Sequence, residues 1–241
     1  MPDAALRFDD EAARKRAPRV ARMFDRIAPT YDLLNHLLSA NVDKAWRATT
    51  VARLALSGRE RVLDACTGTG DLALALLDGG AREVVGTDFA PKMIERAQAK
   101  GGTRATFLVA DTTRLPFESA SFDAATVGFG VRNLEDMDAG FRELHRVLRP
   151  GGRLAVLEFS RPPNPIVRGG YHLYFMLALP LIGNLLSGGA ENAYAYLPRS
   201  VLAFPSPTVL AERLRGSGFA RVDFEPLTLG IAHVHLATKG A

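Results

Sequence analysis

Residues 63–77, LDACTGTGDLALALL, place a glycine-rich turn between an apolar strand and a helix. Gly68, Gly70 and Ala73 fit the pattern G-x-G-x-x-[GA], in which small residues let a ligand approach the backbone at a helix start. Asp88 ends the next expected strand, 20 residues after Gly68. A carboxylate there can accept hydrogen bonds from a ribose diol. This spacing fits NAD as well as other adenosine-containing cofactors.

Acidic residues around this turn favour a cationic ligand over a phosphate. Asp64 ends the first strand and Asp71 opens the helix, so a docked pyrophosphate would lie beside two carboxylates. Like charges a few ångströms apart repel by about 1–4 kcal/mol at effective dielectric constants of 80 to 20. S-adenosylmethionine carries a sulfonium, an ammonium and a ribose but no phosphate, and Asp64 would face its positive end. The alternative is that Asp71 only caps its helix and that Asp64 is hydrogen-bonded to backbone.

A third acidic residue, Asp111, ends the third expected strand. Ligands of open α/β sheets bind at the carboxyl ends of the strands. We therefore expect Asp64, Asp88 and Asp111 to surround one ligand, with Asp111 and Thr112 placed to meet an adenine amino group.

The elements that must position these residues alternate along the chain. Strands are expected at residues 61–65, 83–88, 105–111, 122–130 and 152–160, and helices at 71–79, 91–100 and 137–148. This alternation predicts an α/β fold with a doubly wound, mostly parallel sheet. A helix at 206–219 and two strands within 220–239 would add an antiparallel C-terminal edge.

One domain is expected over residues 1–241. Apolar residues at helical spacing predict an N-terminal helical cap over 1–50. Residues 51–160 would form the cofactor-binding core, and 161–241 a substrate-side insertion followed by the C-terminal strands.

Composition limits the classes of function. The formal net charge of +4 does not demand nucleic acid, and we expect no such partner. The single cysteine, Cys66, excludes an intrachain disulfide, and the N-terminus lacks an apolar signal core, so a cytoplasmic location is expected. The histidines lack metal-ligand spacing, and we predict no metal site. Cys66 has no identifiable base nearby and is not expected to be a nucleophile.

No residue between Arg168 and Glu191 carries a formal charge. Pro180, Gly183 and Asn184 interrupt this run, whose dense apolar part is shorter than the roughly 20 residues of a spanning helix. It is interpreted either as a core helix or as a surface or pocket for a lipophilic substrate.

Longer motifs carry a family resemblance. VLDACTGTGD, GTDFAPKMIERA, ADTTRLPFESASFDAATVGFGVRN and HRVLRPGGRLAVLEFSRP resemble successive motifs of class I S-adenosylmethionine methyltransferases. VARMFDRIAPTYDLLNHLLSANVDKAWR, AYAYLPRSVLAFPSP and LTLGIAHVH resemble more narrowly the quinone-biosynthesis C-methyltransferases, over about residues 19–238. The resemblance implies a Rossmann-like, seven-stranded fold and methylation of demethylmenaquinol to menaquinol. Methylation of 2-polyprenyl-6-methoxy-1,4-benzoquinol in ubiquinone biosynthesis is the alternative, and a non-catalytic module that binds S-adenosylmethionine and an NAD-linked oxidoreductase are more distant ones.

Several residues gain an expected role from this resemblance. Thr67 stands where members acting on the benzoquinol more often have glycine, which favours demethylmenaquinone. Tyr31 would close the cofactor pocket, with a buried structural tyrosine as the alternative. The expected cofactor-binding residues are Tyr31, Asp64, Gly68, Thr69, Gly70, Asp88, Phe89, Asp111, Thr112 and Gly128.

Methylation of a ring carbon requires the quinol and a group that removes or stabilises its hydroxyl proton or oxyanion. Arg132 and Asn133 follow the fourth strand, and we expect Arg132 to stabilise the oxyanion or orient a water and Asn133 to bind a ring oxygen. The alternative for Arg132 is an ion pair with Glu135 or Asp136.

Histidines offer a proton acceptor. His233 and His235 alternate along a late strand, and His233 is the candidate catalytic residue, whereas His145 is expected to be structural.

The expected partner is a polyprenylated quinol, whose tail requires apolar surface. The protein would contact the inner face of the plasma membrane transiently, and a homodimer is left open. Candidates to line a tail tunnel or lie on the bilayer are Tyr171, Tyr174, Phe175, Met176, Leu177 and Leu179, and the alternative is that they form core or a dimer contact.

Overall fold

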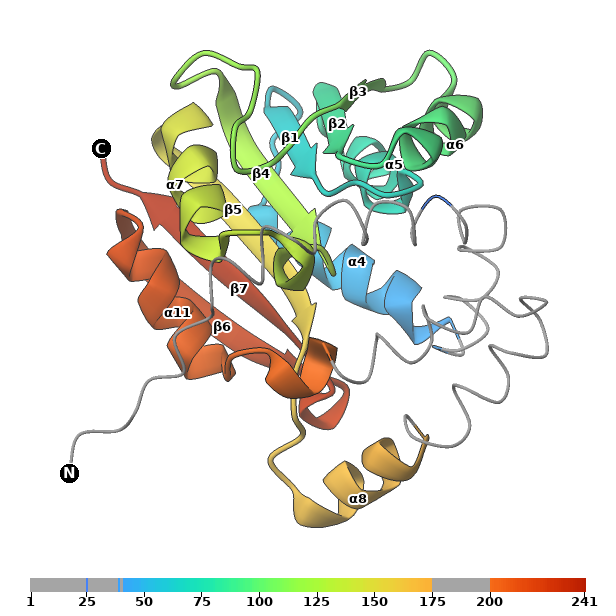
Figure 1. The fold of residues 1–241 in the computed structure, drawn as a ribbon. Coiled ribbons are helices and arrows are strands. Elements are labelled where there is room, and N and C mark those ends of the chain that lie inside the picture. Colours follow the sequence, from blue (N-terminus) through green and yellow to red (C-terminus); the bar gives the residue numbers. More distant parts are fainter. Residues whose placement is uncertain (1–24, 26–38, 40, 175–199) are drawn as a thin grey trace.

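The computed structural model describes residues 25, 39, 41–174 and 200–241, and its centre is a seven-stranded sheet of order β3-β2-β1-β4-β5-β7-β6 (Figure 1). The first five strands pair in parallel, and β7 runs antiparallel to both β5 and β6. This confirms the predicted doubly wound sheet with an antiparallel C-terminal strand. The strands are β1 (Arg61–Ala65), β2 (Glu83–Asp88), β3 (Thr106–Val109), β4 (Phe122–Gly128), β5 (Leu148–Phe159), β6 (Phe219–Leu227) and β7 (Ala232–Lys239).

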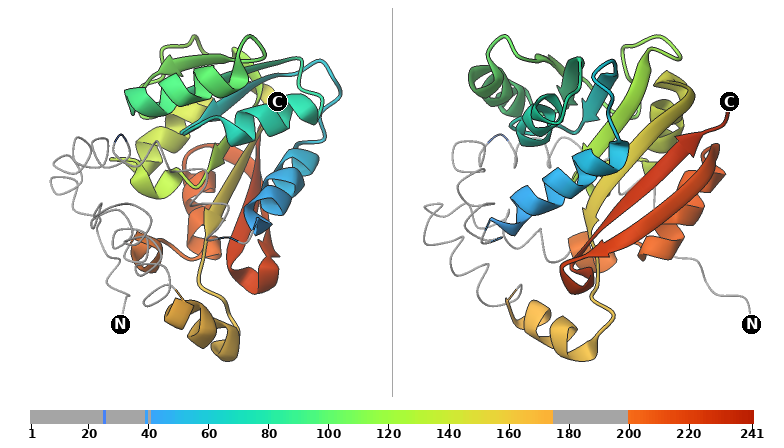
Figure 2. Two further views of the ribbon diagram at one scale, coloured as in Figure 1. Left: turned by 90° about the vertical axis from the view of Figure 1, so that its right-hand side faces the viewer. Right: turned by 180° about the vertical axis from the view of Figure 1, so that it is seen from behind.

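Helices cover both faces of this sheet (Figures 1 and 2). They are α4 (Val42–Leu54), α5 (Asp71–Asp78), α6 (Pro91–Gly101), α7 (Met137–Val147), α8 (Pro165–Leu173) and α11 (Pro207–Gly216), with 3-10 turns η2 (Val131–Asn133) and η4 (Thr228–Gly230). Buried side chains of β1 alternate between the two faces, since Val62 packs with α4, α5 and α6 and Leu63 packs with α7 and α11. Apolar residues on both sides of the central strands thus bury the middle of the sheet on both faces.

The chain reverses its direction of travel across the sheet between β1 and β4. It passes from β1 outward to β2 and β3, and then returns to β4 on the other side of β1. Ligands of doubly wound sheets bind at such a switch point, outside the carboxyl ends of the strands. The loops after β1, β2, β3 and β4 meet at that edge.

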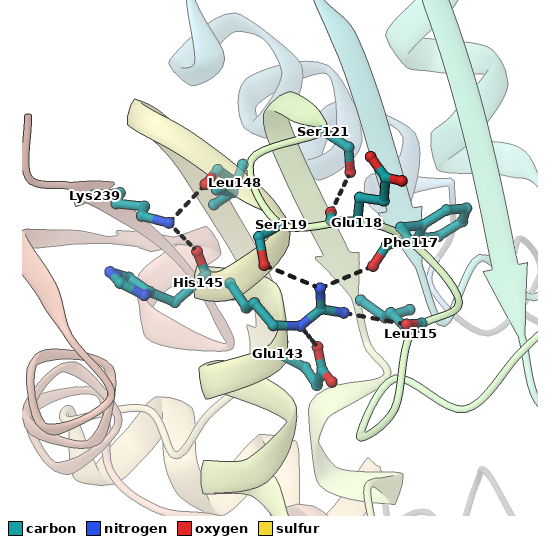
Figure 3. A network of polar contacts seen from close by, with 10 residues as sticks. Leu115, Phe117, Glu118, Ser119, Ser121, Glu143, His145, Leu148 and Lys239 are labelled. Atoms are coloured by element: carbon teal, nitrogen blue, oxygen red, sulfur yellow. Dashed lines mark hydrogen bonds and ion pairs between the residues drawn. The ribbon is translucent and has the colours of Figure 1, made fainter.

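A polar network fixes α7 against the loop that precedes β4 (Figure 3). The guanidinium of Arg146 donates to Glu143 and to the carbonyls of Phe117 and Leu115. Lys239 of β7 donates to two carbonyls at the carboxyl end of α7, at 2.7 Å each. Helix α7 is therefore tied both to the loop after β3 and to the last strand.

Several element boundaries differ from expectation, among them those of β5 and β3. β5 begins at Leu148 rather than at residue 152, because a register shift between Phe122 and Ala124 of β4 lets Leu148 pair with Phe122. β3 ends at Val109, so Asp111 lies in the following loop rather than in the strand. The expected boundary between cap and core, at residue 50, falls within α4.

Candidate functional site

The glycine turn between β1 and α5 requires small residues at specific positions. Gly68 and Gly70 have φ values of 56° and 87°, in the left-handed region. A Cβ on Gly70 would lie 3.1 Å from the ring of Phe107, and one on Gly86 would lie 2.5 Å from the same ring. Phe107 of β3 therefore packs directly against backbone beneath the turn, which holds the turn close to the sheet.

Asp88 joins the end of β2 to this turn. One carboxylate oxygen accepts a hydrogen bond from the backbone N–H of Gly68 and the other from that of Ala90, both at 2.9 Å. The residue is 6% exposed, and burial raises the pKa of its carboxyl to about 6 despite these hydrogen bonds. Phe89 follows it, half-buried. The 20-residue spacing thus brings Asp88 to Gly68, where a ribose could reach it.

Asp64 is fully buried, and both oxygens of its carboxylate are hydrogen-bonded within the protein. Its two oxygens accept hydrogen bonds from the hydroxyls of Thr67 and Thr126, both at 2.6 Å. The alternative of backbone partners is wrong, because the partners are side-chain hydroxyls. Burial raises the pKa of Asp64 to about 6, against the two hydroxyl hydrogen bonds. The hydroxyl of Thr67 thereby orders the carboxylate of Asp64 under the turn.

Asp71 does not present an uncompensated charge. Lys100 lies 2.6 Å and Arg47 3.2 Å from its carboxylate oxygens. Lys100 also donates to the hydroxyl of Thr69, at 3.2 Å. Asp71 therefore no longer argues against a bound phosphate, because its charge is balanced by cations of α6 and α4 that the local sequence does not reveal. The buried carboxylates of Asp64 and Asp88 still disfavour a phosphate at this turn.

The loop after β3 reaches the same turn. The Thr112 hydroxyl lies 3.4 Å from Cys66 Sγ, and Thr112 is buried. Asp111 is exposed, and one of its oxygens accepts from the backbone N–H of Thr113 at 2.8 Å. Burial raises the pKa of the Cys66 thiol well above its usual range, which fits the expectation that it is no nucleophile.

The loop after β4 brings aromatic rings to this edge. A Cβ on Gly128 would lie 3.0 Å from Leu72 of α5, so the backbone of β4 ends close to the turn. Phe129 packs on Phe159 and Trp46, with ring centroids 4.6 Å and 6.0 Å away. An aromatic cluster of Phe129, Phe159 and Trp46 thus lies at the carboxyl ends of β4 and β5.

Arg132 forms an ion pair, but with neither acid expected from the sequence. Its Nη1 donates to Glu158 of β5, and its backbone N–H donates to the other oxygen of that carboxylate at 3.4 Å. Both side chains are buried, at 8% and 2% exposed. Arg132 Nε is buried and has no hydrogen-bond partner within the part of the chain that the structure describes. Asn133 follows, half-buried in η2.

Burial raises the pKa of Glu158, although Arg132 opposes the shift. Sequence reasoning missed this residue. The signal was available, since Glu158 is an acid near the carboxyl end of an expected strand, like Asp64 and Asp88.

Tyr171 of α8 lies near this pair. Burial raises the pKa of its hydroxyl, and the charges of Arg132 and Glu158 act on it in opposite directions. Tyr174 is half-buried. The expectations for Tyr31, Phe175, Met176, Leu177 and Leu179 fall on residues outside those that the structure describes.

His233 lies opposite Glu158 in the β5–β7 register. Its Nδ1 is 2.8 Å from the hydroxyl of Ser160, which itself donates to the Gly230 carbonyl. Because that hydroxyl hydrogen is committed to the carbonyl, His233 Nδ1 must be the donor, and Nε2 carries the lone pair. Burial lowers the pKa of His233 and favours this neutral form.

His235 and His145 are structural. His235 donates from Nε2 to the Pro207 carbonyl and stacks on Phe224, and burial lowers its pKa to about 4. His145 packs edge-on against Phe219, as expected.

One pocket lies away from this site. A 610 Å³ pocket opens at the opposite edge of the sheet and is lined by residues that include Arg59, Arg82, Arg149 and Arg153. Among the described residues, no three His, Cys, Asp or Glu side chains gather as metal ligands would. None of the helices in the described part of the chain combines the length and apolar character needed to cross a membrane.

Residues 11–239 match the model of the ubiE/COQ5 methyltransferase family. The chain is 47% identical to the demethylmenaquinone methyltransferase of Thermus thermophilus over 221 residues, which are 90% of this chain and all of the relative. It is 46% identical to the protein of the same name from Deinococcus radiodurans, covering 91% and 92%. It is 44% identical to the ubiquinone/menaquinone biosynthesis C-methyltransferase UbiE of Geobacter sp. strain M21, covering 95% and 99%.

Solved structures share the fold at lower identity. A possible histamine N-methyltransferase from Thermotoga maritima, described as S-adenosylmethionine-dependent, has a TM-score of 0.66 at 19% identity, covering 90% of this chain and 98% of that one. The [4+2]-cyclase SpnF has a TM-score of 0.69 at 19% identity, covering 93% and 96%. Because one of these neighbours is named as a cyclase, the fold alone does not fix the reaction.

Proposed function

Because the chain belongs to the ubiE/COQ5 methyltransferase family, we propose that it transfers a methyl group from S-adenosylmethionine to demethylmenaquinol, giving menaquinol. The observation that carries this proposal is the similarity, at 46–47% identity over at least 90% of the chain, to two proteins named demethylmenaquinone methyltransferase. The fold agrees with it, since its neighbours include S-adenosylmethionine-dependent methyltransferases.

The switch-point edge fits an adenosine-containing cation. Asp88 would accept the ribose hydroxyls, because its carboxylate is already held against the Gly68 backbone. The cofactor would lie against the backbone of Gly68, Thr69, Gly70 and Gly128. Its adenine would contact Phe89, Asp111 and Thr112. Asp64 would act through its buried charge rather than by contact. Tyr31 keeps the pocket-closing role that the family resemblance implies.

The chemistry requires an electron-rich ring. Bound S-adenosylmethionine supplies an electrophilic methyl group. The new carbon–carbon bond forms as the methyl–sulfur bond breaks, and the ring C–H proton then leaves, so that one proton is released overall. Arg132 would stabilise the quinol oxyanion, because its buried Nε has a hydrogen to donate and no partner. An unsatisfied buried donor is unfavourable by about 1–3 kcal/mol, which a substrate oxygen would recover.

Asn133 would bind a ring oxygen, and His233 is the candidate proton acceptor. Its Nε2 is unprotonated in the tautomer that Ser160 and Gly230 select. His233→Gln should lower kcat at neutral pH and remove a titration below pH 6.5 from the kcat profile. An unchanged profile would exclude His233 as the acceptor.

Methylation of 2-polyprenyl-6-methoxy-1,4-benzoquinol is the second candidate, favoured by relatives whose names include ubiquinone. Purified protein with methyl-labelled S-adenosylmethionine and each reduced quinone in detergent decides between the two. We expect label in menaquinol, with the oxidised quinones as unlabelled controls. Label in neither quinol would reject both substrates and leave a non-catalytic binding module.

We also propose transient contact with the membrane surface, where the polyprenyl tail resides. Helix α8 lies apart from the other labelled helices (Figures 1 and 2) and exposes Ile166 and Leu173, at 85% and 61%. Changing both to Asp should reduce co-sedimentation with anionic phospholipid vesicles. Val209→Asp, at an exposed apolar position of α11, is the matched control. Equal binding by all variants would exclude α8 as the contact.

A further inference from the structure

The carboxylate of Glu158 is committed almost wholly to Arg132. One oxygen pairs with Nη1, and the other accepts from the Arg132 backbone N–H at 3.4 Å. The only further hydrogen bond to this carboxylate among the described residues is from the backbone N–H of Phe159, at 3.1 Å. Glu158 thus holds the arginine by its side chain and by its main chain at once.

The guanidinium is also fixed from a second side. Its central carbon lies 5.4 Å from the ring centroid of Phe159, at a distance typical of a cation–π contact. Glu158 occupies Nη1, which leaves the edge formed by Nε and Nη2. That edge is one of the two that bind a carboxylate or another oxyanion with two parallel hydrogen bonds. Nε is buried and makes no hydrogen bond to any described residue, so its hydrogen is available to a ligand at this edge.

Stability alone does not account for such a pair. A protein is often no more stable with a buried ion pair than with apolar residues of similar volume in its place. The unsatisfied Nε donor makes this ion pair less favourable still. The arrangement is explained if the fixed guanidinium serves a ligand. The hydroxyl of Tyr171 lies close enough for both charges to act on it, so α8 is near this ion pair.

We propose that Glu158 is a positioning residue, which locks the guanidinium of Arg132 so that its Nε–Nη2 edge meets the quinol oxyanion. This inference rests on the function proposed above. A freely rotating arginine would bind the ground state and the transition state about equally. A fixed one is organised in advance for the charge that develops as the methyl group is transferred. Loss of Glu158 should therefore lower kcat more than it raises KM.

The test compares Glu158→Ala, Glu158→Gln, Arg132→Ala and the double variant Glu158→Ala/Arg132→Ala. Glu158→Ala should lower kcat about 100-fold, as loss of an oxyanion donor does, with S-adenosylhomocysteine affinity unchanged within twofold. The double variant should be no worse than Arg132→Ala, because both changes remove one function. Glu143→Gln breaks the ion pair with Arg146, away from this edge, and should leave kcat unchanged.

Glu158→Gln separates positioning from proton transfer, since glutamine keeps the acceptor oxygen without the charge. It should retain kcat within about tenfold. Its kcat profile should rise at lower pH, because the uncompensated Arg132 cation lowers the pKa of the bound quinol, and kcat reports the pKa values of the enzyme–substrate complex. If Glu158→Ala does not fold by thermal melting, this variant alone decides.

Three outcomes would overturn the inference: full activity of Glu158→Ala, additive losses in the double variant, or Glu158→Gln as inactive as Glu158→Ala with an unshifted profile. The last would make Glu158 a proton acceptor. Wild-type protein that labels neither quinol would reject the proposed function, and the inference with it. An active wild type with any of the three outcomes rejects the inference alone.

Discussion

The pKa of Asp88 makes cofactor binding depend on pH. In the unliganded protein this pKa is about 6, raised by burial from its ordinary 3.8. The proposed role at the ribose diol requires the ionised carboxylate, because only that form accepts from both hydroxyls while keeping its backbone partners. Binding should therefore return the pKa toward its ordinary value and release a proton below pH 6.

The size of the effect follows from linkage. For one group with a pKa of about 6 free and 3.8 bound, affinity is about tenfold weaker at pH 5 than at pH 7, or about 1.3 kcal/mol. The sign is set by the raised pKa of the free state, since a proton must be removed before the ligand binds. Calorimetric titration with S-adenosylmethionine between pH 5 and pH 7, in buffers of different ionisation enthalpy, measures both the affinity and the released proton.

Asp88→Asn is the matched variant, since it keeps the size of the side chain but cannot titrate. It should bind S-adenosylmethionine more weakly at pH 7. It should also lose the roughly tenfold difference in affinity between pH 5 and pH 7 that Asp88 causes in the wild type. Any dependence that remains belongs to Asp64, whose pKa is also about 6. Wild-type affinity that stays constant from pH 5 to pH 7, with no proton released, would refute an ionised Asp88 at the ribose.

Three other predictions concern the support of the turn. Phe107→Ala should lower the free energy of unfolding by about 3–5 kcal/mol in urea titration, because its buried ring fills the space between the turn and α6. Gly86→Ala should lower it by about 1–3 kcal/mol, since the added Cβ meets that ring, whereas Gly170→Ala meets nothing and serves as control. Thr67→Gly removes a hydroxyl from Asp64 and should destabilise more at pH 7 than at pH 4, because the lost hydrogen bond favours the ionised carboxylate; equal losses at both pH values would contradict this.

Much of the site could be predicted because it depends on local order along the chain. An apolar strand, a glycine turn and a helix carry Gly68 and Gly70, and the acid that ends the next strand must lie beside them in a parallel sheet. The pairing of Asp88 with the Gly68 backbone follows from that topology. Asp111 was placed at the correct edge for the same reason, although the strand ends two residues earlier.

Ion pairs were predicted poorly. The alternative weighed for Arg132 was an ion pair with a sequence neighbour such as Glu135 or Asp136, but it pairs with Glu158 of β5. Asp71 was interpreted as an open negative charge, but it is neutralised from α4 and α6. Long charged side chains select partners by distance in space, and that distance is set by how helices pack across a sheet.

The sequence by itself determined the strand and helix order, the switch-point edge and the family. These depend on periodicity, on turn residues with positive φ and on motifs, all of which are local in the chain. Only the tertiary structure decided which charges remain available at that edge. Asp64 lies beneath two threonine hydroxyls, and Arg132 is held by Glu158 with one edge left unpaired. Burial and charge compensation arise from residues far apart in sequence, and they fix which groups can act on a ligand.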